Sequence, residues 1–168
     1  MLQPDNKIQA SVEQEKIVSI IRIIDLPISE VWKAWTEAES FKKWWGSAAY
    51  TCPHCEIDLR VGGKNLNCLR EPEGKEFWTT STYLEIDTMK KLVYIDNFSD
   101  KEGNPVLPSY YEIPGIWSEE IKVSVTFQRQ GLKTKIILEQ EGIPEEVHHD
   151  YVIGWNESFN KMEVSLKK

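Results

Sequence analysis

The first third of the chain shows two hydrophobic periods in succession. Residues 16–25 are rich in β-branched side chains, which fit a pleated surface, so a strand covered on both faces is predicted. After Pro27 the apolar side chains take the spacing of one helical face. They are Ile28, Val31, Trp32 and Trp35. A capping box of Thr36 and Glu39 then predicts a second short helix, which ends near Gly46.

Strand patterns dominate the middle of the chain. Residues 55–60 and 64–70 flank Gly62 and Gly63, and paired glycines supply the positive φ angles of a tight turn, so a hairpin with these two turn residues is predicted. Further strands are predicted at residues 77–86, 89–98, 121–127 and 132–140. The clearest alternation is in 121–127, where every second side chain is apolar.

The period changes once more after Gly142. Pro144 and the two glutamates behind it favour a helix start, because negative charge is stabilising at the positive end of the helix dipole. An apolar stripe then continues to the end of the chain on a helix of roughly 22 residues. Its members are Val147, Tyr151, Trp155, Phe159, Met162 and Leu166. An antiparallel sheet must curve around this helix to bury both, which predicts an α+β fold with a cavity between them.

Composition limits the class of protein. The chain has 168 residues, 40% of them hydrophobic, which fits a single domain, predicted at residues 15–168 after a polar, loosely ordered lead-in at 1–14. It has 27 acidic and 20 basic residues, and the net charge of -7 argues against nucleic-acid partners. No apolar run reaches the roughly 20 residues that span a bilayer, and no secretory signal pattern is present. We therefore expect a cytoplasmic protein without membrane insertion.

Four segments resemble a known family. They are IRIIDLPISEVWKAWTEAESFKKWWG, DLRVGGK, VTFQRQGLKTKIIL and GWNESFNKM. Together they resemble the domain shared by homologues of the heat-shock-protein-90 ATPase activator, within the START-like (SRPBCC) superfamily. The resemblance implies the helix-grip fold, with an internal cavity that in the superfamily receives lipids, polyketides and other apolar small molecules. The activator is a two-domain co-chaperone and this chain resembles its C-terminal part, so we do not expect it to stimulate the chaperone's ATPase.

Tryptophans mark the expected core and the expected cavity rim. Four of the seven lie within residues 27–46. Trp32 and Trp35 share a helical face, which favours a role in core packing. Trp44 and Trp45 are adjacent and cannot both point inward, so one is expected at the rim, where an indole tolerates a wet edge.

The C-terminal helix is expected to line the cavity with Tyr151 and Trp155. Gly154 lies beside them, and a glycine there serves either close packing or room for a ligand. The full set of candidate ligand-binding residues is Trp35, Trp44, Trp45, Asp58, Arg60, Trp78, Tyr83, Tyr111, Trp117, Tyr151 and Trp155.

Asp58 and Arg60 project from the same face of their predicted strand. One interpretation is an exposed ion pair of little energetic weight. The other places Arg60 at the cavity mouth, where it steers an anionic group of a ligand.

Three cysteines form the next candidate cluster. Cys52 and Cys55 make a C-x-x-C, and the predicted hairpin places Cys68 opposite Ile57, near Cys55. Inert thiols are the favoured interpretation; a redox-sensitive pair and a zinc site of these three thiolates remain alternatives, although no fourth ligand is evident. We therefore expect no metal and no cofactor.

The segment 100–117 is long and lacks clear periodicity, which is typical of a lid, a binding loop or disorder. Its aromatic residues, Tyr110, Tyr111 and Trp117, argue against disorder. A lid over the cavity is favoured, and a packed loop without a ligand role is the alternative.

No motif of a known catalytic class is present, and the catalytic residues are unknown. Polar residues that can carry protons in a cavity are Asp58, Tyr83, Glu85 and His148. The leading hypothesis is a protein that binds an apolar or aromatic small molecule. The alternatives are a cyclase or hydrolase acting in the cavity, and a co-chaperone-like interaction module.

Overall fold

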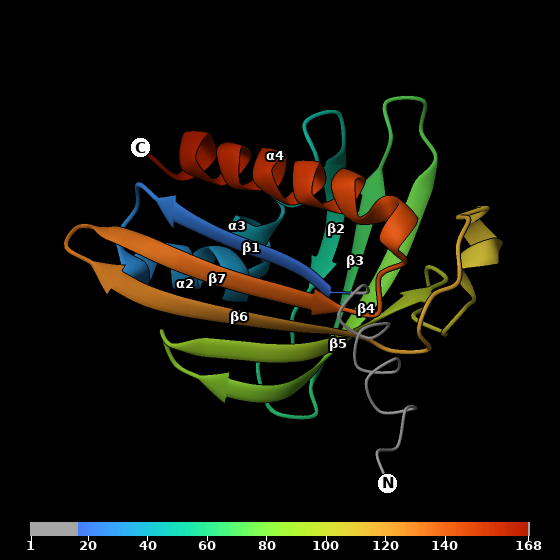
Figure 1. The fold of residues 1–168 in the computed structure, drawn as a ribbon, viewed down its shortest axis with the longest axis horizontal. Helices are drawn as coiled ribbons and strands as arrows, with labels where there is room; N and C mark the ends of the chain where they lie inside the picture. The colour runs from blue at the N-terminus through green and yellow to red at the C-terminus, as the bar shows by residue number, and fades with distance from the viewer. Residues whose placement is uncertain (1–16, 168) are drawn as a thin grey trace, which may run out of the picture.

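The structure is a computed structural model that describes residues 17–167, so the lead-in predicted at residues 1–14 lies outside the described residues. Seven antiparallel strands form one curved sheet in the order β1-β7-β6-β5-β4-β3-β2, and the long C-terminal helix runs alongside it (Figure 1). This arrangement is the α+β helix-grip fold that the sequence predicted.

The elements follow the predicted order of one strand, two short helices, six strands and one long helix. The strands are β1 (Ile17–Ile24), β2 (Thr51–Glu56), β3 (Lys64–Arg70), β4 (Glu76–Asp87), β5 (Lys91–Ser99), β6 (Ile121–Gln130) and β7 (Lys133–Glu141). The helices are α2 (Ile28–Thr36), α3 (Ala38–Phe41) and α4 (His148–Leu166), with 3-10 helices η1 (Pro108–Tyr111) and η2 (Glu145–Val147). Within residues 17–167, no helix is long and apolar enough to cross a membrane.

Strict alternation along the strands creates the inner face of the sheet. On β6 the buried side chains are Ile121, Val123, Val125 and Phe127, as predicted. On β7 they are Thr134, Ile136, Leu138 and Gln140. These alternating positions specify the strand register, because a slip of one residue would turn every inward side chain outward.

The tryptophan-rich segment packs against both the sheet and α4. The Trp35 ring lies 4.9 Å from the Trp44 ring, 5.8 Å from that of Trp155 on α4 and 6.0 Å from that of Phe127 on β6. Trp44 is fully buried, and its Nε1 donates to the carbonyl of Ala34 at 2.8 Å. Helices α2 and α3, the sheet and α4 therefore meet in one aromatic cluster.

Edge strand β1 anchors the C-terminal helix. Arg22 Nη1 donates to the carbonyl of Asn156 at 2.8 Å, and Nη2 donates to Asn160 Oδ1 at 2.5 Å. Glu163 lies 3.9 Å from the same guanidinium. Because Arg22 contacts two successive turns of α4, it fixes the position of the helix along the edge of the sheet.

The predicted capping box was wrong. Thr36 is the last residue of α2, and its hydroxyl donates back to the carbonyl of Trp32 at 2.7 Å. Glu37 occupies the N-cap of α3 and makes no side-chain capping bond. A threonine hydroxyl can bond to its own helix as easily as to the next one, and here the first helix takes it.

The two-residue hairpin was also wrong. Strands β2 and β3 are joined by a loop of residues 57–63, and the register pairs His54 with Cys68. Gly62 has a φ of 82°, and a Cβ on Gly63 would lie 2.1 Å from the carbonyl oxygen of Asp58. The two glycines permit a compact loop rather than a minimal turn.

The prediction that β1 is covered on both faces was wrong as well. The side chains of Ile21 and Ile23 are 65% and 50% exposed. Among the described residues β1 pairs with β7, and the outer face of this strand leaves its apolar side chains accessible to solvent.

A matched pair of leucines tests the inner face of β7. Leu138 is fully buried, whereas Leu132 in the β6–β7 turn is 86% exposed. We expect Leu138→Ala to lower the free energy of unfolding by roughly 2–5 kcal/mol, because it removes buried methyl groups and leaves a cavity. Leu132→Ala should change it by less than about 0.5 kcal/mol. Urea denaturation measures both, and equal effects would contradict the assigned register.

Candidate functional site

A cavity of about 560 Å³, partly open to solvent, lies between the N-terminal half of α4 and the sheet. Its walls come from β3, β4, β5 and β7, from the loop 45–50 after α3, and from the loop 113–121 before and into β6. A volume in this range suits a ligand of drug size. Trp155 lines the cavity and also packs against Trp35, so the aromatic cluster adjoins the cavity.

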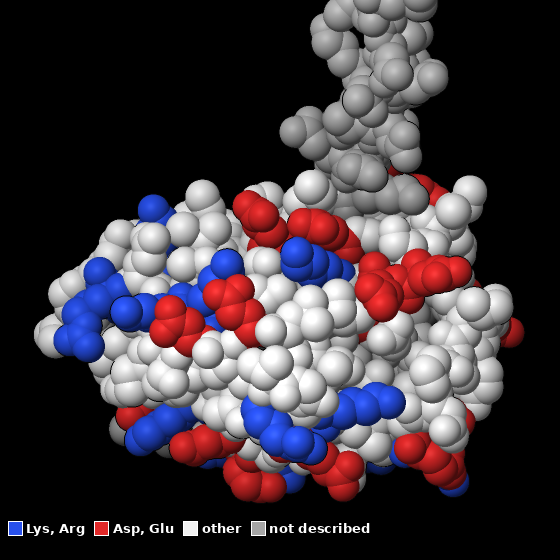
Figure 2. Space-filling model, turned by 90° about the horizontal axis from the view of Figure 1, so that it is seen from below, with Lys and Arg blue, Asp and Glu red and all other residues white. Residues whose placement is uncertain are grey.

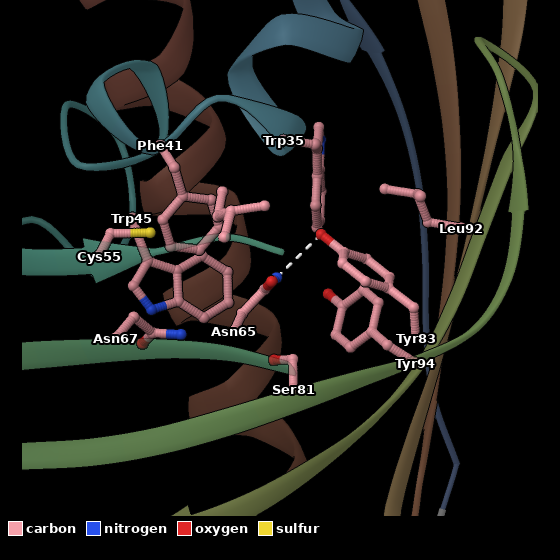
Figure 3. Close-up of a pocket in the computed structure, with 11 residues that line it drawn as sticks. Trp35, Phe41, Trp45, Cys55, Asn65, Asn67, Ser81, Tyr83, Leu92 and Tyr94 are labelled. Atoms are coloured by element: carbon pink, nitrogen blue, oxygen red, sulfur yellow. Dashed lines mark hydrogen bonds between the residues drawn. The ribbon is translucent and has the colours of Figure 1, made fainter. Parts of the chain in front are cut away.

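A second, much smaller pocket of about 20 Å³ lies on the other side of Trp45. Figure 3 shows its lining side chains converging from the two short helices and from strands β2 to β5, with Asn65 donating to the Tyr83 hydroxyl at 2.8 Å. This volume holds about one water molecule. The larger cavity is therefore the candidate ligand site.

Seven aromatic side chains line the cavity. They belong to Trp45, Tyr50, Phe77, Phe98, Trp117, Tyr151 and Trp155. The Trp117 ring lies 5.4 Å from that of Phe98 on β5 and 5.8 Å from that of Tyr151 on α4. The Trp45 ring lies 5.1 Å from that of Trp155. Such rings offer a large apolar surface at little cost in side-chain entropy.

One carboxyl group faces the cavity from β5. Asp96 lines the cavity, and one of its oxygens accepts a hydrogen bond from the Ser81 hydroxyl at 2.5 Å. Burial raises the pKa of Asp96 to about 7, and the hydrogen bond from Ser81 opposes that shift only in part. Asp96 can therefore exchange a proton near neutral pH, which an ordinary surface carboxyl does not do.

Neutral polar groups surround this carboxyl. Burial, and secondarily the Asp96 charge, raise the pKa values of the Tyr151 and Tyr94 hydroxyls, so both stay protonated at neutral pH. Gln140 on β7 also lines the cavity, and its Oε1 accepts from Trp155 Nε1 at 2.9 Å. The cavity thus combines an aromatic wall with a few fixed polar groups.

Helix α4 holds the loop 45–50 at the rim of the cavity. Lys161 Nζ donates to the carbonyls of Gly46 and Tyr50, both at 3.0 Å, with longer bonds to two neighbouring carbonyls. The Ala48 amide donates to Glu157 Oε2 at 2.7 Å. Gly154, one turn before Glu157, faces open space, because a Cβ there would have no atom within 4 Å apart from its own helix backbone and chain neighbours. Gly154 therefore leaves room beside the cavity rather than permitting close packing.

The long loop 100–117 is fastened to the sheet by Tyr111. Its buried hydroxyl accepts from the Trp78 amide at 3.1 Å and donates to the Ser99 carbonyl. Beyond this anchor the loop places Ile113 and Trp117 in the cavity wall. One part of the loop is thus fixed, and the following part lines the cavity.

Comparison with known proteins identifies the family. A family model described as "Activator of Hsp90 ATPase homolog 1-like protein" matches residues 25–167. The chain belongs to this family. No match was found among curated proteins.

Solved structures of similar fold come from several bacteria. Protein NE0264 from Nitrosomonas europaea is 23% identical with a TM-score of 0.74, covering 91% of this chain and 95% of that one. Protein CV1439 from Chromobacterium violaceum is 19% identical with a TM-score of 0.75, covering 91% and 98%. The AHSA1 protein SPO3351 from Silicibacter pomeroyi is 14% identical with a TM-score of 0.71, covering 90% and 97%. At these identities the likeness concerns the fold.

In this member of the activator-homologue family, the structure separates the predicted site residues into several groups. Trp45, Trp117, Tyr151 and Trp155 line the cavity. Trp35 and Tyr83 line the small pocket, and Trp44 and Tyr111 are buried in supporting positions. Trp78 projects from the face of β4 opposite to Phe77 and Thr79, with its ring 5.4 Å from that of His54.

Asp58 and Arg60 lie outside the cavity. Both are on the exposed loop 57–63, where Arg60 Nε pairs with Asp58 Oδ2 at 2.9 Å. Their side chains are 47% and 74% exposed, respectively. The surface-pair interpretation therefore describes them, and the steering role for Arg60 loses its geometric basis.

The residues predicted to act as general acids or bases also lie apart from one another in the structure. Glu85 is exposed and lies 3.4 Å from Lys91 Nζ. His148 Nε2 is 2.8 Å from the carbonyl oxygen of Ile143. Neither side chain lines the cavity within the described part of the chain.

The cysteines do not form a ligand set. Cys68 pairs with His54 rather than with Ile57, and residues 17–167 contain no group of three His, Cys, Asp or Glu side chains placed to hold a metal. Burial raises the pKa of Cys52 to about 11 and that of Cys55 to about 12. Thiols with such pKa values are poor nucleophiles at neutral pH, which fits the favoured interpretation of inert thiols.

Sequence reasoning missed the polar residues of the cavity. The signal was present in the strand period: Leu92, Tyr94, Asp96 and Phe98 occupy alternate positions on β5, so a carboxyl follows two inward apolar residues. Gln140 likewise continues the inward series of β7. Asp96 and Gln140 are polar residues at positions where the strand alternation otherwise places apolar side chains, and this departure marks the polar part of the cavity.

Asp96 makes stability depend on pH. Its folded pKa of about 7 exceeds its usual value of about 4, so the folded state binds more protons between these values, and stability is lost as pH rises from about 4 through 7. We expect Asp96→Asn to be more stable than the unmodified chain at about pH 8, by roughly 1–3 kcal/mol, and about equally stable near pH 5. Urea unfolding at the two pH values measures this, and a variant that is less stable at pH 8 would contradict it.

Neighbouring tyrosines test the loop anchor. Tyr111→Phe leaves the Trp78 amide and the Ser99 carbonyl without their buried partner, so we expect a loss of roughly 1–3 kcal/mol in unfolding free energy. Hydrogen exchange across residues 100–117 should become faster. Tyr110→Phe, at a residue that is 61% exposed, serves as the control and should change neither quantity. Identical exchange in the two variants would show that Tyr111 is not the anchor.

Proposed function

We propose that this protein binds an apolar or aromatic small molecule in the cavity beneath α4. The observation that carries the proposal is a ligand-sized volume of about 560 Å³ whose walls include seven aromatic side chains. Membership in the activator-homologue family, with its START-like fold, is compatible with such a role. Trp45, Trp117, Tyr151 and Trp155 are the predicted site residues that this proposal retains.

Magnitudes indicate what the aromatic wall can contribute. A ligand that buries roughly 300 Å² of apolar surface gains about 7 kcal/mol at 25 cal/mol per Å². Association costs at least about 4 kcal/mol in lost freedom of motion. The apolar wall alone therefore supports weak binding, and a polar anchor is needed for tight, selective binding.

Surface charge gives no support for a nucleic-acid partner. The chain carries a net charge of -7, which repels phosphate backbones. On the face seen in Figure 2, Lys and Arg side chains lie interspersed with Asp and Glu side chains rather than in one basic patch. These observations argue against a nucleic acid as the partner.

A catalytic role in the same cavity is the second candidate function. Asp96 lines the cavity with a pKa of about 7 and lies near the Tyr151 hydroxyl, so it can act as a general acid or base there. A cyclase or hydrolase would use such a group. Recovery of a bound compound after incubation, with mass spectrometry of its structure, separates binding from turnover.

Gly154 allows the cavity to be filled without disturbing its neighbours. No atom lies within 4 Å of its Cβ position, so Gly154→Leu should fold normally and occupy ligand space. We expect it to reduce binding of naphthalene-sized aromatics at least about tenfold in native mass spectrometry and calorimetry. Gly154→Ala, the matched control, should retain most binding and stabilise α4 by roughly 1 kcal/mol.

Two results would contradict the proposal. One is the absence of binding across a screen of aromatic and lipid-like compounds with the unmodified protein. The other is unchanged affinity in a folded Gly154→Leu variant, which would place the ligand elsewhere.

A further inference from the structure

The charged side chains that line the cavity are of one sign, and the Lys161 ammonium at the rim is taken up by backbone carbonyls of the loop 45–50. Among the residues described by the structure, the lining includes the carboxyl groups of Asp96, Asp150 and Glu157 and no Lys, Arg or His side chain. Asp96 lies on the sheet side, whereas the other two project from α4. A ligand with a carboxylate or phosphate group would meet repulsion from these carboxylates.

Asp96 is the innermost of the three. Its only hydrogen-bond partner among the described residues is the Ser81 hydroxyl, and no cationic side chain of that part of the chain lies within 4 Å of it. The carboxyl is buried by surrounding protein, yet it lines the cavity. Its second oxygen is therefore available to a hydrogen-bond donor that enters the cavity.

The other two carboxyl groups differ in exposure. Asp150 is exposed at the mouth, and Glu157 already accepts a hydrogen bond from the Ala48 amide. They contribute negative potential at the entrance, whereas Asp96 offers a direct contact inside. A cation is thus attracted by Asp150 and Glu157 at the entrance and can form an ion pair with Asp96 inside the cavity.

The aromatic wall favours the same kind of group. An ammonium group is attracted to the faces of aromatic rings, most strongly where water is excluded. Tyr151 and Trp117 lie together at 5.8 Å, and the Tyr151 hydroxyl is close enough to Asp96 for the carboxyl charge to raise its pKa. A cation bound at Asp96 would thus lie beside an aromatic surface.

We propose that the ligand of this cavity is a cationic amine with an aromatic or apolar body, whose ammonium group donates to the Asp96 carboxylate. This inference rests on the proposed function and adds the chemical class of the ligand. The same charges disfavour fatty acids and other anionic lipids. The ion pair supplies the polar anchor that the apolar wall lacks.

Three probes that share one ring system test the headgroup. They are 2-naphthylmethylamine, 2-naphthylmethanol and 2-naphthoate, measured by isothermal titration calorimetry. We expect the amine to bind at least about tenfold more tightly than the alcohol, and the carboxylate to bind more weakly than the alcohol.

Asp96→Asn tests the contact itself. It should reduce affinity for the amine by roughly tenfold or more while changing affinity for the alcohol by less than about threefold. Asp87→Asn is the control, because Asp87 is an exposed carboxyl at the end of β4, away from the cavity lining. It should leave all three affinities unchanged.

Affinity for the amine should also rise with pH as Asp96 loses its proton. The groups that face Asp96 are the Ser81, Tyr83, Tyr94 and Tyr151 hydroxyls, which remain protonated near neutral pH. Asp150 and Glu157 are the other charged groups of the cavity lining within residues 17–167. The alcohol, which carries no charge, should show a much smaller pH dependence.

The outcomes separate this inference from the proposed function. If the alcohol binds but the amine binds no better, or if Asp96→Asn leaves the amine affinity unchanged, the amine proposal is overturned and ligand binding stands. If none of the three probes binds, the amine proposal is overturned, and the proposed function is contradicted as well if the wider screen of aromatic and lipid-like compounds also finds no ligand. Tighter binding of 2-naphthoate than of the amine would reverse the assigned charge preference.

Discussion

The packing of Trp35 against Trp44, Trp155 and Phe127 is the interaction on which this architecture depends. Each partner comes from a different part of the fold: the segment after α3, helix α4 and strand β6. Indole rings are large, so the cluster holds the helix away from the sheet at one end and fills the space there. Toward the N-terminal end of α4 the filling is incomplete, and the cavity lies in that part of the interior. The same aromatic packing thus fills the core at one end of α4 and leaves the cavity at the other.

A buried carboxyl group at the cavity wall lowers the free energy of unfolding when it is ionised. Burial raises the pKa of Asp96 to about 7, which means that the ionised form costs free energy in the folded state. An asparagine or an apolar residue would fill the same inward position of β5 without that cost. Natural proteins tolerate such costs chiefly where a group serves binding or catalysis. The position of Asp96, between aromatic walls and open to the cavity, fits that explanation.

The fold could be predicted from the sequence because its elements have strong periods. Alternation on β6 and the apolar stripes of α2 and α4 required no knowledge of distant contacts, and the order of elements left few ways to bury them. Predictions of local structure were wrong where two arrangements have similar energies. Thr36 could cap either helix, and Gly62 and Gly63 suited either a minimal turn or a longer loop. The wrong hairpin then misplaced Cys68 and made Asp58 and Arg60 seem close to the cavity.

The site could be predicted only in part. Aromatic residues such as Trp45, Trp117 and Tyr151 drew attention through their size, and the structure brings them to one cavity. Asp96 and Gln140 were overlooked because a polar residue in a strand usually faces solvent, and only the inward register reveals otherwise. The separation of cavity from core depends on how far α4 is held from the sheet. That distance results from the aromatic cluster as a whole and is encoded in no single residue.

The most direct test of this account is an NMR titration that follows the indole N–H signals with 2-naphthylmethylamine. The account predicts that the signals of Trp117, Trp45 and Trp155 shift, because these rings line the cavity. Those of Trp32 and Trp44, which are buried in the core, should shift little. Shifts confined to Trp32 and Trp44, or shifts of equal size in all seven indoles, would contradict the division of the tryptophans into core and cavity wall.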